Sequence, residues 1–208
     1  MLPLILDLSG RKVVIFGGGP VGARKAAFFL GECRVRVASR SFGKEVRGMD
    51  VERVKIDIAA ATNEVLRGLV EGAFLVIAAL KDPALNSRIL ALSRELGILC
   101  NSATGDPGDV IIPSVWKGKS HILAVTTFGR SPAMARYIRE KVPLDADQID
   151  LMIDLQARAR EALKAGEPSQ EKRSAILREI LQDKAAWKAL PGGEDVAWRY
   201  VERRYLHG

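Results

Sequence analysis

The segment VVIFGGGPVGARKA, residues 13–26, limits the possible folds of this chain more than any other stretch of its sequence. Gly17, Gly19 and Gly22 form the pattern G-x-G-x-x-G between an apolar, strand-like run and a run of helical composition, which is the context of a dinucleotide-binding loop. In such a loop the first glycine permits the turn, the second lets a pyrophosphate reach the backbone, and the third lets the helix pack closely on the sheet. The alternative interpretation is a glycine-rich connector without a ligand.

Strand-like and helix-like segments alternate along the first half of the chain. The expected strands cover residues 12–17, 34–39, 51–57, 73–80 and 98–103, and the expected helices cover 20–31, 62–70 and 83–96. The segment AFLVIAAL at 73–80 is apolar throughout, as a central parallel strand covered on both faces would be. The alternation predicts the α/β class and a Rossmann-type doubly wound parallel sheet.

The pattern changes after residue 107. Two apolar runs flank the sequence KGK within residues 108–132 and predict an antiparallel hairpin. A helix is expected over 131–142, with Ser131 as its N-cap, and helical spacing of apolar residues continues along the rest of the chain. We therefore expect a dinucleotide-binding Rossmann domain, a small α+β region and a helical C-terminal domain, over residues 1–112, 113–144 and 145–208.

The positive charge of the chain is concentrated in its first part. The formal net charge is +7, and residues 1–144 hold 21 Lys and Arg against 13 Asp and Glu, whereas residues 145–208 hold 11 against 12. Such a basic surplus attracts either nucleic acid or a small ligand rich in carboxylates or phosphates. The sequence has no basic run with interleaved aromatic residues, so we expect no nucleic-acid partner.

The composition of the chain disfavours a membrane protein, a secreted protein and a metal-binding protein. No apolar run approaches the roughly 18 residues of a membrane span, and no basic leader or cleavage site is recognisable, so we expect a cytoplasmic protein with no membrane partner. Cys33 and Cys100 lack metal-like or redox-like spacing, which favours reduced, buried thiols. His121 and His207 lack ligand spacing, so we expect no metal site, and His121 beside the hairpin turn is predicted to be exposed.

The residues after the second expected strand leave the choice of dinucleotide open. Proteins that bind NAD usually have an acid there for the ribose hydroxyls, whereas a nearby arginine suits the 2′-phosphate of NADP. This chain has Ser39, Arg40 and Ser41 at that position. Arg40 could hold a 2′-phosphate, stack on adenine or be a solvated charge.

Longer motifs resemble one family of tetrapyrrole enzymes. In chain order they are LDLSGRKVVIFGGG, GGGPVGARKA, FLVIAAL.D..LN.RI, LCN, IIPS and LAVTTFGRSPAMARYIREK, and they extend over about residues 1–142. The combination of IIPS with AVTTFGRSP.MAR..RE is the most specific part. The chain thus resembles the precorrin-2 dehydrogenase / sirohydrochlorin ferrochelatase family, which includes the N-terminal part of bacterial sirohaem synthase.

The resemblance implies an NAD-binding Rossmann domain, a dimerisation region, a helical C-terminal region and a homodimer. It implies the NAD-dependent oxidation of precorrin-2 to sirohydrochlorin, and in some members the insertion of Fe²⁺, as a substrate metal, to give sirohaem. The substrate would be a flat tetrapyrrole with several carboxylates, which accounts for a basic surplus in residues 1–144. Whether this chain inserts iron stays open.

The resemblance also assigns residues to the site. The positions that match the family's cofactor-binding residues are Gly17, Gly18, Gly19, Pro20, Val21, Gly22, Arg40, Ser41 and Ala79. Thr127 matches a family position near the tetrapyrrole cleft. We also predict Asn101, Thr104, Arg130 and Arg136 as substrate-binding residues, because arginines can bind substrate carboxylates bidentately. Judged from the residues alone, Arg136 could equally form an ion pair on a helix surface, and Thr127 could equally serve the hairpin.

The family's catalytic aspartate has no direct counterpart in this chain. The family carries it three residues after the asparagine of CN, where this chain has Thr104, and the loop that leads to IIPS is one residue shorter than usual. A one-residue shift of the loop would bring Asp106 to the same place, so we predict Asp106 as the catalytic carboxylate and general base, with Asp109 second. Both could instead be turn residues of the segment GDPGD. The displaced acid also leaves open an NAD-binding regulatory or sensor module without catalysis.

Overall fold

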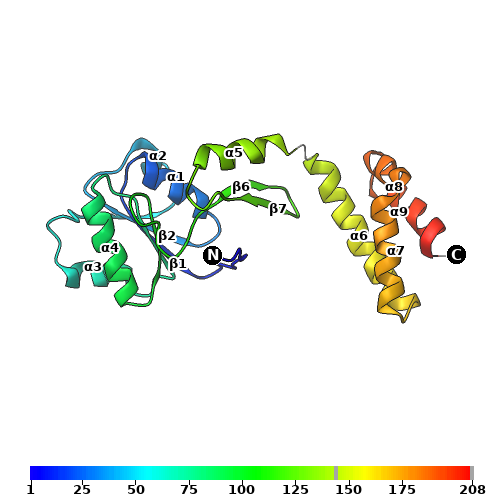
Figure 1. Cartoon of the computed structure of the whole chain (residues 1–208), viewed down its shortest axis with the longest axis horizontal. Helices are drawn as coiled ribbons and strands as arrows, with labels where there is room; N and C mark the ends of the chain where they lie inside the picture. The colour runs from blue at the N-terminus through cyan, green and yellow to red at the C-terminus, as the bar shows by residue number, and fades with distance from the viewer. Residues whose placement is uncertain (143–144, 207–208) are drawn as a thin grey trace. The chain divides into compact units, whose positions relative to one another are not determined.

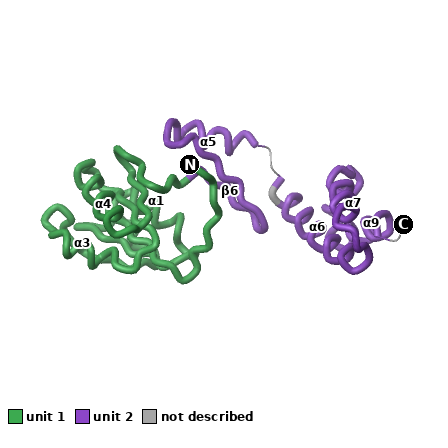
Figure 2. The backbone as a smooth tube through the Cα atoms, turned by 60° about the horizontal axis from the view of Figure 1, so that its bottom comes forward, with its two compact units in different colours: residues 1–112 green, residues 113–208 purple. Residues whose placement is uncertain are grey.

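A computed structural model describes residues 1–142 and 145–206 of the chain. The chain divides into two compact units, Met1–Ile112 and Pro113–Gly208, which Figure 2 colours green and purple. The division into three domains stays a prediction, because its second boundary falls at residues 143–144, outside the described part of the chain. His207 lies outside it as well.

The first unit is built on a parallel sheet with the strand order β3-β2-β1-β4-β5. Its strands are β1 Lys12–Phe16, β2 Arg34–Ser39, β3 Glu52–Lys55, β4 Leu75–Ala78 and β5 Leu99–Ser102. Its helices are α1 Pro20–Phe29, α2 Lys44–Arg47, α3 Asn63–Val70 and α4 Pro83–Glu95. Figure 1 labels β1 and β2 of this sheet and the helices α1, α2, α3 and α4 of the same unit. The predicted α/β fold with a doubly wound parallel sheet is confirmed, and only the short α2 has no counterpart among the expected elements.

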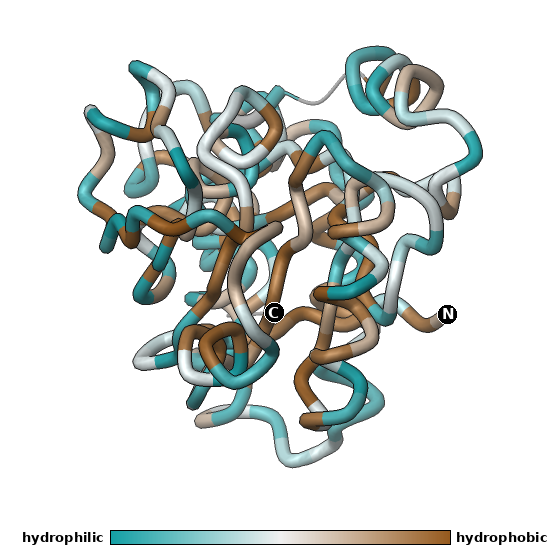
Figure 3. The backbone as a smooth tube through the Cα atoms, turned by 90° about the vertical axis from the view of Figure 1, so that its left-hand side faces the viewer, coloured by the Kyte–Doolittle hydropathy of each residue, from teal (hydrophilic) through white to brown (hydrophobic). Residues whose placement is uncertain are grey.

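The sheet separates two hydrophobic layers, because successive side chains of a strand point to opposite faces. Phe16 of β1 packs on one face with Leu66 of α3 and Ile89 of α4, whereas its neighbour Ile15 packs on the other face with Ala26 of α1. All five side chains are fully buried. Figure 3 shows hydrophobic, brown stretches of the backbone in the middle of the view. Both faces of β1 and β4 are covered by these layers, which explains why the two strands read as continuous apolar runs.

The second unit contains a two-stranded antiparallel sheet and a group of helices. The strands are β6 Ser114–Lys117 and β7 Ile122–Val125, as the hairpin prediction required. The helices are α5 Pro132–Lys141, α6 Ala146–Gly166, α7 Gln170–Gln182, α8 Lys184–Ala189 and α9 Glu194–Val201, with a 3₁₀ turn Leu190–Gly192 and a final π-helical turn Glu202–Leu206. Leu155 of α6, Ile180 of α7 and Ala197 of α9 are buried in one core cluster. Among the described residues, no helix is long and apolar enough to cross a membrane.

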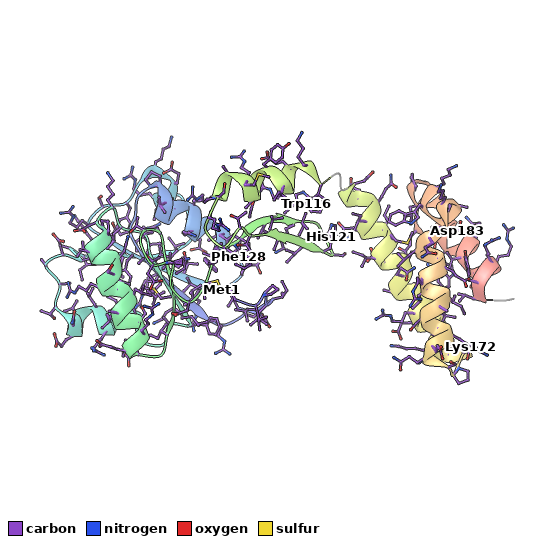
Figure 4. All side chains as sticks on the ribbon, in the orientation of Figure 1. Met1, Trp116, His121, Phe128, Lys172 and Asp183 are labelled. Carbon is purple, nitrogen blue, oxygen red and sulfur yellow. The ribbon has the colours of Figure 1, made fainter. Side chains whose placement is uncertain are left out.

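The prediction that His121 is exposed was wrong. Its side chain is only 17% exposed, its Nδ1 lies 2.8 Å from Oδ1 of Asp150, and its ring lies against Trp116 with 4.9 Å between centroids (Figure 4). The amides of Lys119 and Ser120 donate to the same carboxylate, at 2.8 and 2.7 Å. The partner lies 29 residues further along the chain, so the sequence around the turn gives no sign of it.

Candidate functional site at the carboxyl edge of the sheet

The turn after β1 requires glycine at Gly17 for two reasons. Its φ of +121° lies in a region that side chains avoid, and a Cβ there would lie 2.4 Å from the carbonyl oxygen of Ala79. The Gly17 amide also donates to the Ala38 carbonyl at 2.9 Å. The first glycine of the motif therefore packs directly on the chain that leaves β4, where the two halves of the sheet meet.

Gly19 and Gly22 serve the start of α1 in different ways. A Cβ on Gly22 would lie 1.8 Å from the Gly17 carbonyl oxygen, so glycine is required there for the helix to approach the turn. A Cβ on Gly19, the N-cap residue, would meet nothing within 4 Å. No side chain caps α1, and its first turn, which begins with Pro20 and Val21, holds no acidic residue. The amides at this positive end of the helix are thus free of side-chain partners, as a bound pyrophosphate needs.

Gly18 has a packing role that the motif alone does not indicate. A Cβ there would lie 2.3 Å from the Ser41 carbonyl oxygen, and the Gly43 amide donates to the Gly18 carbonyl at 2.8 Å. The loop after β1 is therefore fastened to the segment that follows β2. This contact places Ser41 beside the glycine loop, as an adenosine-binding segment should be.

Arg40 extends into solvent at the same edge. Its side chain is 75% exposed, and its nearest acid is Asp57, with Nη1 3.7 Å from Oδ2. An exposed ion pair of this length leaves the guanidinium able to approach an adenosine or a 2′-phosphate. The geometry fits NAD and NADP alike.

Asn86 of α4 joins the ends of β4 and β5 at this edge, although nothing in the sequence marked it as a site residue. It is fully buried, and its amide oxygen accepts from the Leu80 amide at 3.0 Å. Its Nδ2 donates to the Leu80 carbonyl at 3.0 Å and to the Thr104 hydroxyl at 2.7 Å. The one available sign was a polar residue among the apolar positions of an amphipathic helix.

Asn101 lies within β5 and Thr104 in the loop that follows it, and the two residues have different surroundings. Asn101 is 5% exposed and its Nδ2 donates to the Val110 carbonyl at 2.7 Å, while its Oδ1 has no hydrogen-bond partner among the described residues. Thr104 is exposed apart from its contact with Asn86. Thr104 therefore faces solvent at the carboxyl edge, where a substrate can reach it.

Both candidate carboxylates already have hydrogen-bond partners, from their own loop, from β5 and from α4. Asp106 accepts from the Gly108 amide at 2.8 Å and from Nη2 of Arg94 at 3.0 Å, and these two contacts hold its pKa below the usual value. Asp109 accepts from the Cys100 amide at 3.1 Å and lies 3.7 Å from Nε of Arg94. These are the contacts of the turn-forming alternative, and the catalytic role of either aspartate stays a prediction.

The candidate substrate residues of the second unit lie around the N-terminus of α5. Thr127 accepts from the Ser131 amide at 3.0 Å and donates to its carbonyl at 2.9 Å, so its hydroxyl organises the turn before the helix. Arg130 is exposed. Arg136 pairs with Glu140 one helical turn away, at 2.7 Å, with its side chain 73% exposed. The ion-pair alternative for Arg136 is thus seen, and it leaves the guanidinium at the surface.

Metal-ligating residues do not cluster in the part of the chain that the structure describes. No group of three His, Cys, Asp or Glu side chains there could hold a metal ion. Both cysteines are free thiols, and burial raises the pKa of Cys100 to about 11, which keeps it protonated.

Comparison with known proteins agrees with this geometry. A family model described as "Putative NAD(P)-binding" matches residues 4–114. A precorrin-2 dehydrogenase of Methanosarcina barkeri is 40% identical over 98% of this chain and 92% of its own length. A siroheme synthase of Ectopseudomonas mendocina is 30% identical over 98% of this chain, which spans 44% of that protein.

A solved structure shows the same fold. SirC, precorrin-2 dehydrogenase, superposes with a TM-score of 0.72 at 22% identity, covering 98% of this chain and all of the other. The Rossmann-type sheet, the small antiparallel sheet and the C-terminal helices thus recur in a protein of different sequence. On the glycine-loop geometry, the family model and the near full-length identity, this chain belongs to the precorrin-2 dehydrogenase family.

Proposed function

We propose that this chain is an NAD-dependent dehydrogenase that oxidises precorrin-2 to sirohydrochlorin on the route to sirohaem. The observation that carries the proposal is the identity of 40% to a precorrin-2 dehydrogenase over 98% of the chain. The uncapped start of α1 and the open surface at Gly19 support the cofactor part, because both are what a pyrophosphate requires.

The first unit supplies the cofactor-binding residues. Backbone amides at the start of α1 bind the pyrophosphate, and the segment Arg40–Ser41 holds the adenosine. Ala79 follows β4 at the crevice between β1 and β4, where sheets of this order bind a dinucleotide. NAD⁺ supplies a hydride acceptor when bound, and the residues around it orient the two reactants.

A carboxylate of the loop after β5 accepts the proton that is lost beside the hydride. Asp106 is our first candidate and Asp109 the second. The lowered pKa of Asp106 keeps it ionised at neutral pH, as a proton acceptor must be, and also makes it a weak base. Substrate binding that displaces Arg94 would raise that pKa and strengthen the base.

Basic residues bind the carboxylates of the tetrapyrrole. Arg130 and Arg136 are exposed, and the pair between Arg136 and Glu140 is a surface pair that a substrate carboxylate can replace. Asn101 and Thr104 supply polar contacts at the carboxyl edge. A homodimer, the use of NAD in preference to NADP, iron insertion and a cytoplasmic location belong to the same proposal.

The test is a direct assay of turnover. Purified protein is mixed with precorrin-2 and NAD⁺, and sirohydrochlorin and NADH are followed by absorbance. We expect both products in equal amounts. Binding of NADH without any product would favour the regulatory alternative and overturn the proposal. A second assay with sirohydrochlorin and Fe²⁺, without NAD⁺, measures iron insertion separately.

A further inference from the structure

The side chain of Asn86 connects two loops that approach the reaction centre from different strands. One is the Ala79–Leu80 segment after β4, and the other is the loop that carries Thr104 and Asp106 after β5. The connection uses three hydrogen bonds of 2.7 to 3.0 Å from one fully buried amide. Helix α4 therefore reaches both loops through a single side chain.

The orientation of this amide is determined by its partners. The Leu80 amide can only donate, so it faces the oxygen of Asn86, and the Leu80 carbonyl can only accept, so it faces the nitrogen. The second hydrogen of that nitrogen then points to the Thr104 hydroxyl. No other common side chain of this length has one acceptor and two donors arranged in this way.

The two loops carry residues of the proposed site. The backbone of Ala79 packs against Gly17, where a Cβ would lie 2.4 Å from the Ala79 oxygen, and the Ala79 amide donates to the Phe16 carbonyl at 2.8 Å. A shift of Leu80 would therefore also move Ala79 and, through it, the backbone at Gly17 of the glycine loop. A shift of Thr104 moves the start of the loop that holds both candidate carboxylates.

We propose that Asn86 is a positioning residue that keeps the cofactor-binding segment after β4 and the acid-bearing loop after β5 in register for hydride and proton removal. The inference rests on the proposed dehydrogenase function. Because Asn86 is buried beneath both loops, it acts through Leu80 and Thr104 and does not touch the reactants. Its loss should therefore reduce the rate of the chemical step more than it weakens dinucleotide binding.

The test compares three single variants and one double variant. Asn86→Ala removes all three hydrogen bonds, Thr104→Val removes one with little change of shape, and Ser93→Ala is the matched control. Ser93 is also fully buried in α4, but its hydroxyl donates to the Ile89 carbonyl at 2.8 Å, within its own helix. The measurements are kcat and KM with precorrin-2, the Kd for NADH, and circular dichroism.

We expect kcat to fall by about 10- to 100-fold in Asn86→Ala, since a small misplacement of reacting groups has effects of this size. Thr104→Val should lower kcat by about 3- to 10-fold, as the loss of one hydrogen bond does. The double variant should match Asn86→Ala in kcat, because Thr104 affects the chemical step through its bond to Asn86, whereas a direct contact of Thr104 with the substrate would change KM. The Kd for NADH should stay within about threefold in all variants, a change below 1 kcal/mol. Ser93→Ala should keep the kcat of the unsubstituted protein.

Several results would overturn the inference. Folded Asn86→Ala with an unchanged kcat would refute it, as would additive effects in the double variant. If Asn86→Ala does not fold, an unchanged kcat in Thr104→Val is sufficient to refute it. Failure of the unsubstituted protein to form sirohydrochlorin refutes the proposed function, whereas an active protein with unaffected variants refutes only the role of Asn86.

Discussion

Replacement of Gly17 by alanine should destabilise the first unit far more than the same replacement at Gly19. In Gly17→Ala the new Cβ would lie 2.4 Å from a backbone oxygen of Ala79 and 2.9 Å from its carbon, and neither can move without disturbing the pairing of β1 with β4. The φ of +121° adds backbone strain of about 1–3 kcal/mol. Overpacking of a closed site costs about 1–3 kcal/mol more. The sum, about 2–6 kcal/mol, is a large part of the stability of a small domain, about 5–15 kcal/mol.

The assay is denaturant unfolding followed by circular dichroism, together with titration of NADH. Gly19→Ala should cost about 1 kcal/mol or less, the difference between glycine and alanine at an N-cap, because its φ is −86° and nothing lies within 4 Å of its Cβ. The same methyl group occupies the space into which a pyrophosphate must fit, so NADH affinity should fall at least about tenfold, or 1.4 kcal/mol. Equal unfolding midpoints for the two variants would refute the packing argument. Unchanged NADH affinity in Gly19→Ala would refute the binding site.

Three further predictions concern other parts of the chain. The pKa of Asp106 is lower in the folded state than in the unfolded chain, so its ionised form stabilises the fold above the unfolded pKa, and this stabilisation is lost as the pH falls through the folded pKa. Asp106→Asn lacks this contribution and should therefore lose less stability than the unsubstituted protein on acidification below about pH 4, as measured by urea unfolding. Asp150→Ala should speed hydrogen exchange of the amides of residues 119–120, which lose their acceptor; unchanged exchange would contradict this. Leu155→Ala, at a fully buried position, should destabilise the protein by about 2–5 kcal/mol in the same assay, whereas Leu181→Ala, at a 45% exposed position, should change it by less than about 1 kcal/mol.

The order of the secondary-structure elements in the first unit could be predicted from neighbouring residues. Apolar runs and helical spacing located every strand of the parallel sheet, and Pro and Gly at helix ends located the helix boundaries to within a few residues. The glycine motif identified the turn between β1 and α1. Element α2 was not expected, because four residues carry too little periodicity to be distinguished from a loop.

The sequence located some of the residues that the structure brings together at the carboxyl edge of the sheet, and their binding roles stay predictions. The glycine loop, Arg40 and Thr104 lie at the carboxyl edge of one sheet, as a dinucleotide-binding arrangement requires. Asp106 lies in the loop after β5, but the interaction with Arg94 came from α4 and could not be read from the loop itself. Asn86 was overlooked because a lone asparagine in a helix gives no sign of what it contacts.

Local patterns in the sequence determined the class of fold, the strand-to-helix order and the position of the glycine turn, because these depend on residues that are close together in the chain. Only the tertiary structure decided which side chains meet. Gly17 meets Ala79, Asn86 meets Thr104, and His121 meets Asp150 across separations of 18 to 62 residues. Such contacts depend on strand register and helix packing, which arise only when distant segments come together.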